Sequence, residues 1–385
     1  MRDDEQALRR ALSEQAPPDA AGAEERAWRV VRAAFAEGVP RRPRRTRRAA
    51  ALALAGAIVI VAISPAGAKV RDWVDDAVTG SEPSQPALTA LPAPGRLLVD
   101  SAQGPWIVQS DGSKRLLGDY EQATWSPHGL FVAATSGHQL VALDPHGDVR
   151  WSVARQGLIA TPRWSPDGFR IAYLSGAELR IVAADGTGDH VLRRHVSRAV
   201  APAWRPGSAH VVGFGGAHGT VQVASADTGR PIFRTARLKP LQVLWSADGS
   251  RLIVVRTAEI RIYNARGRLL STQPVQPTVR MAAVSPRGEI AVLTRDSGPD
   301  QSRLLLIDRS GHERQLFAGP GEFSEAAWSP DGASLLLAWR SADQWLFLRP
   351  DQPRRTLAVS NIAGQFSPGG TPVGFPAVAG WCCAP

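Results

Sequence analysis

The chain has very little cysteine. Only two of its 385 residues are cysteines, Cys382 and Cys383, and they are adjacent. Adjacent cysteines cannot join distant strands, so no disulfide framework holds this fold together. Two cysteines alone also cannot complete a structural zinc site. We interpret the pair as free or locally paired thiols.

Tyrosine is scarce too, with 3 residues against 12 tryptophans. This imbalance suggests a repeated motif that uses tryptophan. The chain also holds 36 glycines and 30 prolines, which suit many tight turns and argue against an all-helical fold. Hydrophobic residues make up 44% and charged residues 21%, a globular composition that excludes disorder of the whole chain.

The sequence motifs of common enzymes are absent. No G-x-S-x-G elbow occurs, and the eight histidines form no H-E-x-x-H pair. His190 and His195 stand five residues apart, and we interpret them as exposed residues at strand ends. The glycine-rich stretch 213–219 has His218 where a dinucleotide motif requires glycine, so we interpret it as a turn. We therefore predict a protein that is not an enzyme, with no catalytic, cofactor-binding or metal-binding residue.

The net charge of +10 is unevenly distributed. A basic cluster lies directly before an uncharged stretch, and such clusters indicate membrane topology more often than nucleic-acid binding. We therefore predict no nucleic-acid partner. The cluster comprises Arg41, Arg42, Arg44, Arg45, Arg47 and Arg48.

Residues 49–68 contain no charged side chain and are rich in Leu, Ile and Val. Twenty helical residues span about 30 Å, the thickness of a bilayer's hydrocarbon core. We predict a single transmembrane helix over 49–68. The positive-inside rule then places residues 1–48 in the cytoplasm and the rest outside, beginning with a linker over 69–95. The expected location is the cell membrane.

Two alternatives to this anchor remain open. Ala66-Gly67-Ala68 has the small-x-small form of a signal-peptide cleavage site, so the segment could be removed after Ala68. A buried helix of a soluble domain is the other, but six preceding arginines fit it poorly. We favour the retained anchor.

The predicted cytoplasmic segment contains an amphipathic helical pattern over residues 21–37. Ala27, Val31, Ala34 and Phe35 recur at three- to four-residue spacing. The helix could bind a cytoplasmic protein, or it could lie along the lipid surface as a simple tail. The arrangement resembles single-pass anti-sigma factors, although residues 1–48 lack the histidine and C-x-x-C of their zinc-associated pattern.

One motif recurs seven times at gaps of 39, 40, 41, 39, 44 and 38 residues. Each copy has an aromatic or aliphatic anchor followed by a turn of the type Ser-Pro-Asp-Gly, and then by two apolar runs separated by a polar turn. Four short strands in about 40 residues correspond to one blade of a β-propeller. The anchors are Trp125, Trp164, Trp204, Trp245, Val284, Trp328 and Phe366.

We predict an all-β, seven-bladed propeller over residues 96–385. Its last blade would join C-terminal strands at 362–367 and 373–378 to N-terminal strands at 97–99, 106–109 and 114–117, which leaves no open sheet edge. Six blades is the alternative, if the last repeat is degenerate.

The turn motif has a structural explanation. Proline fixes φ near −65°, aspartate bonds the local backbone, and glycine accepts a positive φ. The large anchor suits packing between neighbouring blades. Asp167, Asp248 and Asp331 could be imagined as calcium ligands, but their recurrence in the turn favours a structural role. They also differ from the S-x-D-x-G-x-x-W box of sialidase-like propellers, because here aspartate directly precedes glycine.

These repeats resemble the TolB-type, WD40-like propellers, whose blades carry W-S-P-D-G followed by an apolar strand. The resemblance covers roughly residues 96–375 and implies the propeller fold. Several copies depart from the pattern: His128, Arg287 and Gly369 replace the aspartate, Ala247 replaces the proline, and Ser208 stands where the glycine belongs.

A rigid disc with loops on its faces suits binding more than chemistry. We therefore expect a membrane-anchored binding platform for a protein, peptide or cell-envelope component on the propeller face. One alternative is a transmembrane sensor whose residues 21–37 bind a cytoplasmic protein. The second alternative is a hydrolase or lyase with a site in the central channel, which two convergent carboxylates or a histidine cluster would favour.

Overall fold

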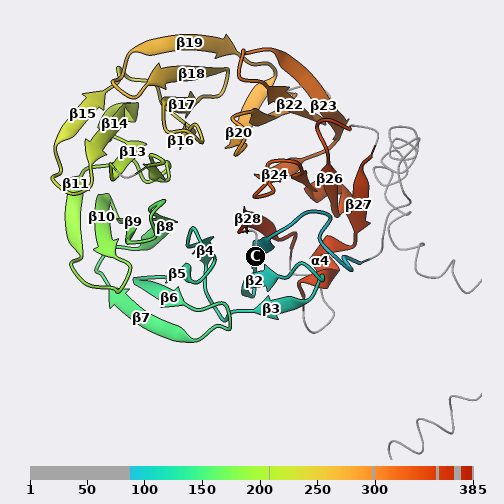
Figure 1. Cartoon of the computed structure of the whole chain (residues 1–385), viewed down its shortest axis with the longest axis horizontal. Helices are drawn as coiled ribbons and strands as arrows, with labels where there is room; N and C mark the ends of the chain where they lie inside the picture. The colour runs from blue at the N-terminus through green and yellow to red at the C-terminus, as the bar shows by residue number, and fades with distance from the viewer. Residues whose placement is uncertain (1–86, 208, 297–299, 353–354, 368–373, 384–385) are drawn as a thin grey trace, which may run out of the picture. The chain divides into compact units, whose positions relative to one another are not determined.

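A computed structural model describes residues 87–207, 209–296, 300–352, 355–367 and 374–383. These residues form seven four-stranded antiparallel sheets arranged as blades around a central axis (Figure 1). The prediction of an all-β, seven-bladed propeller is confirmed, and the six-bladed alternative is wrong.

Blades 1 to 3 follow the chain from the inner strand to the outer one. Blade 1 comprises β4 (Gln122–Trp125), β5 (Val132–Ser136), β6 (Gln139–Leu143) and β7 (Val149–Ala154). Blade 2 comprises β8 (Ile159–Trp164), β9 (Arg170–Ser175), β10 (Glu178–Ala183) and β11 (His190–Arg194). Blade 3 comprises β12 (Ala203–Trp204), β13 (Val211–Gly215), β14 (Val221–Ser225) and β15 (Pro231–Arg234), with a 3₁₀ turn, η1, at Ala217–Gly219.

Blades 4 to 6 repeat this order. Blade 4 comprises β16 (Gln242–Trp245), β17 (Arg251–Val255), β18 (Glu259–Asn264) and β19 (Leu269–Pro274). Blade 5 comprises β20 (Thr278–Val284), β21 (Ile290–Arg295), β22 (Gln301–Ile307) and β23 (Glu313–Pro320). Blade 6 comprises β24 (Phe323–Trp328), β25 (Leu335–Trp339), β26 (Gln344–Leu348) and β27 (Leu357–Ser360), with η2 at Arg340–Ala342.

Blade 7 is built from both ends of the described chain. Its inner strand is β28 (Ala377–Cys382), which pairs with β1 (Arg96–Ser101), and β2 (Gly104–Val108) and β3 (Lys114–Leu116) complete the sheet. Leu97 of β1 lies opposite Trp381 of β28. The prediction that the two ends close one blade is confirmed, and closure leaves the ring without an open edge.

The strand predicted at 362–367 is wrong, and so is Phe366 as the seventh anchor. Residues Ile362–Gln365 form a short helix, α4, and Phe366 follows it. The Phe366 ring packs 5.9 Å from Trp106 of blade 7 and 5.4 Å from Trp345 of blade 6, so it fills the space between two sheets. The innermost strand begins only at Ala377, later than predicted, and residues 368–373 lie outside the described residues.

Trp381 is the actual seventh anchor. It pairs with Leu97 just as Trp125 pairs with Val132 and Trp164 with Ile171. It follows Trp328 by 53 residues, because α4 and its neighbours are inserted there. The insertion explains why a period of about 40 residues misses this anchor.

The anchors pack between neighbouring blades, as predicted. Trp164, for example, lies in a cluster of buried residues with Ala133 and Leu140 of the preceding blade. The turns behave as predicted too: Asp167 and Asp331 accept backbone N–H bonds from Phe169 and Ala333 at 3.0 and 2.9 Å. The following glycine of each turn has a positive φ, +78° at Gly168 and +65° at Gly332.

The ring has two faces. We call the face that carries the turns between first and second strands the turn face; it also carries the turns between third and fourth strands. The opposite side, which carries the remaining connections, is the loop face. The described chain reaches β1 at the turn face: Leu88 and Leu91 are buried against blades 6 and 7, and the Leu91 N–H bonds the Ser110 carbonyl at 2.9 Å.

The predicted cytoplasmic segment 1–48, the predicted membrane helix 49–68 and the linker up to residue 86 lie outside the described residues. Within the described part of the chain, no helix is long and apolar enough to cross a membrane.

Candidate functional site

The polar residues considered as candidate ligands in the sequence do not come together in one site. Asp167, Asp248 and Asp331 each bond within their own turn. His190 and His195 are exposed at the two ends of β11, as predicted. Among the residues that the structure describes, no group of three or more His, Cys, Asp or Glu side chains could hold a metal ion.

The glycine-rich stretch and the cysteine pair also have structural roles. Residues 213–219 form the end of β13 and the short turn η1, so they connect two strands as predicted. Cys382 and Cys383 are bonded to each other, which is the locally paired form, and the Cys383 Sγ lies 3.2 Å from the Pro127 carbonyl oxygen. The pair therefore lies where blade 7 meets blade 1.

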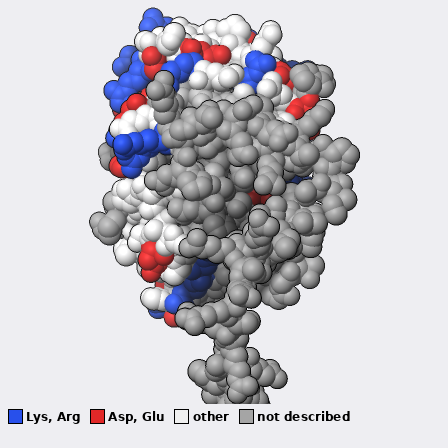
Figure 2. Space-filling view, turned by 90° about the vertical axis from the view of Figure 1, so that its right-hand side faces the viewer, with Lys and Arg blue, Asp and Glu red and all other residues white. Residues whose placement is uncertain are grey.

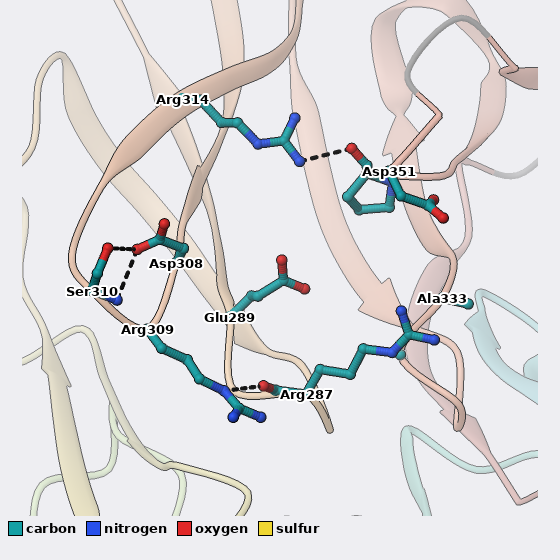
Figure 3. A pocket seen from close by; sticks show the side chains of 10 residues that line it. Arg287, Glu289, Asp308, Arg309, Ser310, Arg314, Ala333 and Asp351 are labelled. Carbon is teal, nitrogen blue, oxygen red and sulfur yellow. Dashed lines mark hydrogen bonds between the residues drawn. The ribbon is translucent and has the colours of Figure 1, made fainter.

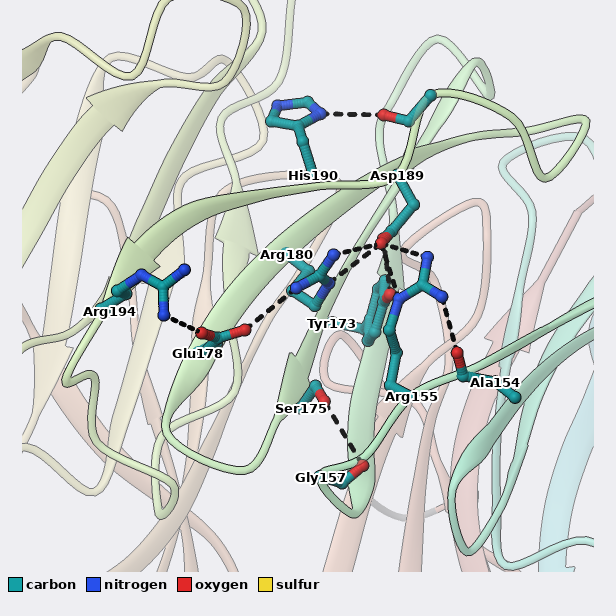
Figure 4. A network of polar contacts seen from close by, with 11 residues as sticks. Ala154, Arg155, Gly157, Tyr173, Ser175, Glu178, Arg180, Asp189, His190 and Arg194 are labelled. Carbon is teal, nitrogen blue, oxygen red and sulfur yellow. Dashed lines mark hydrogen bonds and ion pairs between the residues drawn. The ribbon is translucent and has the colours of Figure 1, made fainter.

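A buried carboxylate, Asp189, joins blades 1 and 2 (Figure 4). Its side chain is 5% exposed and accepts bonds from Arg155 Nε at 2.7 Å, Arg180 Nε at 3.0 Å and the Tyr173 hydroxyl at 2.5 Å. Burial by itself raises the pKa of Asp189, but the bonds from Arg180, Tyr173 and Arg155 outweigh it and hold the pKa below its usual range. Both oxygens are satisfied, so this network stabilises the ring rather than awaiting a ligand.

A single charged residue stands out on the innermost strands at the position directly before the anchors. The residue directly before each anchor lies on the innermost strand, and one of the seven, Arg163, is charged; the others are Thr124, Ala203, Leu244, Ala283, Ala327 and Gly380. Arg163 lines a cavity of about 360 Å³ with residues of β8, β12 and β16. Desolvation by the surrounding protein atoms lowers the pKa of Arg163, and the charge of Asp100 opposes this shift, while part of the residue remains exposed to solvent.

Asp100 of β1 occupies a position that is uncharged in the other six blades. The strand register aligns it with Thr135, Leu174, Gly215, Val255, Leu293 and Ala338. Burial raises the pKa of Asp100 to about 7; a hydrogen bond from the Ala123 backbone and the charge of Arg163 oppose the shift, and the charge of Glu325 adds to it. Its Oδ1 is buried and has no hydrogen-bond partner among the described residues.

Glu325 of β24 stands three residues before an anchor, where blades 1 and 4 have glutamine. Gln122 Oε1 accepts the Thr161 N–H at 2.7 Å, and Gln242 Oε1 accepts the Ala282 N–H at 2.7 Å, so each amide joins two inner strands. Glu325 makes the corresponding bond to the Val378 backbone of blade 7.

The glutamate differs from those amides in carrying a charge. Burial raises the pKa of Glu325, the charge of Glu322 adds to the shift, and the bonds from Ser324 and Val378 oppose it. Its Oε2 is buried and has no partner among the described residues.

Asp100, Glu325 and Arg163 therefore form the candidate site. Two carboxyl groups interact closely enough for one charge to raise the pKa of the other, and a guanidinium lies within electrostatic reach. A raised carboxyl pKa combined with unpaired buried oxygens is typical of binding and catalytic sites. Two rigid acceptors and one cation can bind a ligand that carries both donors and an acceptor.

A second hollow lies on the turn face between blades 5 and 6 (Figure 3). It has a volume of about 640 Å³ and is lined by Arg287, Arg309, Arg314, Glu289 and Asp351. Arg314 donates to the Pro350 carbonyl at 2.7 Å, and Arg287 to the Asp331 carbonyl at 3.0 Å. A larger hollow of about 930 Å³ adjoins it and shares Arg309. Charged side chains line both hollows.

The comparisons with known proteins support the propeller alone. No protein-family model and no curated protein matches the sequence. Among solved structures, the chain is similar to a functionally unknown protein from Desulfotomaculum acetoxidans, with 15% identity over 76% of this chain and 100% of that one, and a TM-score of 0.56. It is also similar to the Pseudomonas aeruginosa periplasmic gluconolactonase PpgL, with 18% identity over 76% and 99% of the two chains and a TM-score of 0.54.

The WD40 domain of Sif2 is a third similar structure, with 11% identity over 72% of this chain and 89% of that one, and a TM-score of 0.52. Identities this low establish only the fold. The chain is a seven-bladed β-propeller similar to WD40 and other propellers. Membership of the TolB-type group stays a prediction.

None of the three residues of the candidate site was predicted from the sequence. Asp100 follows the predicted strand 97–99 by one residue, and nothing in its neighbours distinguishes it. The available signal was comparative: once the seven copies are aligned by register, Asp100 and Glu325 are the only charged residues at their two positions.

Proposed function

We propose that this protein is a membrane-anchored extracytoplasmic β-propeller that acts as a non-catalytic binding platform for a protein, peptide or cell-envelope component. The observation that carries the proposal is the pair Asp100 and Glu325, each with a buried, unpaired carboxylate oxygen on a rigid ring. An unpaired buried acceptor costs about 1–3 kcal/mol, a cost that a ligand's donor would remove.

The anchor rests on the sequence. Residues 49–68 are uncharged, and six arginines precede them, which favours retention in a membrane with the propeller outside. Residues 21–37 would then face the cytoplasm. Recovery of a specific protein with the full-length chain, but not with a chain lacking residues 21–37, would support the sensor or anti-sigma-like alternative.

Capture with immobilised full-length protein tests the binding platform. The probes are a muropeptide digest of the cell wall and a tryptic digest of envelope proteins, and bound material is quantified by mass spectrometry. The double variant Asp100→Asn/Glu325→Gln preserves side-chain shape but removes both charges. Asp351→Asn, on the turn face, is the matched control. We expect the double variant to lose components that the wild type and the control retain; equal retention by all three would contradict the proposal.

Two interacting carboxyl groups also favour the enzymatic alternative, a hydrolase or lyase in the central channel. One group with a raised pKa can act as an acid while its neighbour acts as a base. If the wild type converts a captured glycan or peptide and Glu325→Gln does not, the protein is an enzyme and not a binding platform.

A further inference from the structure

The turn face carries most of the exposed apolar surface. Leu130 and Phe169 directly follow the turn glycines of blades 1 and 2 and are 64% and 69% exposed. The corresponding residues of blades 4, 5 and 6 are Ser250, Glu289 and Ala333, so the turn itself does not require an apolar side chain there. Large apolar residues this exposed need another explanation.

The rim of the same face is apolar as well. Val149, Ile232, Leu269 and Leu270 lie at the beginnings of the outer strands β7, β15 and β19, which start at the turn face, and each is at least 44% exposed. With Phe131, these residues account for seven of the nine exposed large apolar side chains in the part of the chain that the structure describes.

Unpaired cations accompany the apolar residues. Arg251, Arg287, Arg309 and Arg314 line the two hollows of the turn face, and none of the four forms an ion pair within the described ranges. The same hollows hold four carboxylates, of which Asp248 and Asp308 bond N–H groups of their own turns; the other two are Glu289 and Asp351. Figure 2 views the rim of the ring from the side and shows basic side chains at its upper left, with acidic ones among them.

The chain reaches the propeller from this side. Residues 87–95 pack beside the Ser110 turn, so the tether leaves the ring at the turn face. Only residues 69–86 separate the first described residue, 87, from the apolar stretch 49–68. Eighteen residues span at most about 60 Å. The turn face can therefore rest on a membrane directly, whereas the loop face could do so only if the tether passed around the ring.

We propose that the turn face lies against the outer surface of the bilayer. Leu130, Phe131 and Phe169 would enter the boundary between headgroups and acyl chains, and the four arginines would meet lipid phosphates. This inference rests on the proposed membrane anchor. β1 ends and β24 begins at the loop face. The proposed orientation therefore places Asp100 and Glu325 on the side away from the membrane, towards ligands in solution.

Photocrosslinking tests the orientation. The photoreactive p-benzoylphenylalanine replaces Phe169 in the full-length chain, which is reconstituted into nanodiscs of phosphatidylglycerol and phosphatidylcholine. The matched control replaces Leu158, an apolar residue of the loop face that is 52% exposed. After irradiation, lipid adducts at each position are quantified by mass spectrometry. We expect about tenfold more lipid adducts at position 169, since interfacial residues enter the lipid by only 5–10 Å.

Equal or reversed yields in a chain that stays with the nanodisc would overturn the orientation and leave the anchor intact. Adducts from position 169 to a second copy of the chain, in place of lipid, would also overturn it, because the apolar surface would then be a protein interface. A chain that separates from the nanodiscs on flotation would overturn both the anchor and the orientation.

Discussion

The indole N–H of Trp204 donates to the backbone carbonyl of Arg163, 2.9 Å away, across the boundary between blades 3 and 2. Trp245 and Trp328 bond Ala203 and Ala283 in the same way, at 3.2 and 3.1 Å. Each accepting residue directly precedes the anchor of the preceding blade. These three tryptophans thus fill the space between blades and also fix their register.

Replacing Trp204 by phenylalanine removes this bond but keeps an aromatic ring. We expect a loss of about 1–3 kcal/mol in the free energy of unfolding, because the Arg163 carbonyl loses a partner and the smaller ring leaves a gap. Trp164→Phe is the control, since the Trp164 Nε1 is buried without a partner in the described structure. Urea unfolding compares the two, and an equal loss in both would show that the hydrogen bond contributes nothing.

Glu325→Gln tests whether the glutamate is kept for its charge. The amide can accept the Val378 N–H as Gln122 and Gln242 accept theirs, without a buried charge. We expect stability at pH 7 to rise by about 1 kcal/mol or more, since burial disfavours the charged form. The reciprocal Gln242→Glu variant should lose stability under the same conditions. A destabilised Glu325→Gln protein would contradict this interpretation.

Asp100 predicts a specific pH dependence. Its pKa is about 7 in the folded protein against an ordinary pKa of 3.8, so the unfolded chain gives up this proton first as pH rises. Stability should therefore fall between about pH 4 and pH 7, by at most about 4 kcal/mol, and stay level above that range. Asp100→Asn should flatten this segment of the profile. Thermal unfolding across the range measures it; a profile unchanged by the substitution would show that Asp100 does not cause it.

The Asp189 network should matter for stability and not for ligand binding. Asp189→Asn removes the charge that Arg155 and Arg180 share; Arg180 keeps its ion pair with Glu178, but Arg155 loses its carboxylate partner at the blade boundary. We expect a loss of about 3 kcal/mol in unfolding free energy. Asp185→Asn, in the same turn but exposed, should have little effect. If Asp189→Asn unfolds like the wild type but loses ligand capture, the network belongs to the binding site instead.

The fold was predictable because its information is local and repeated. An anchor and a turn of the Ser-Pro-Asp-Gly type specify a corner between two strands, and the even spacing specifies the ring. Prediction failed where one copy departed from the pattern: Trp381 has no such turn after it and follows an insertion. Phe366 and the residues after it match the motif, but the Phe366 ring fills the space between blades 6 and 7.

The candidate site could not be predicted in the same way, because it depends on contacts between distant segments. Asp100 is near the beginning of the propeller and Glu325 near its end, and only the closure of blade 7 brings them together. The charge of Arg163 acts on Asp100 from blade 2. None of the three belongs to a recognisable motif, so their unusual environment appears only when the ring is closed.

The most direct test of the account is the topology of the full-length chain. Reporter domains that are active on only one side of a membrane are fused after Glu37 and, in a separate chain, after Gly95. For an anchored extracytoplasmic propeller, we expect the first reporter to be active only in the cytoplasm and the second only outside. Activity of both reporters on the same side would contradict the anchored extracytoplasmic propeller.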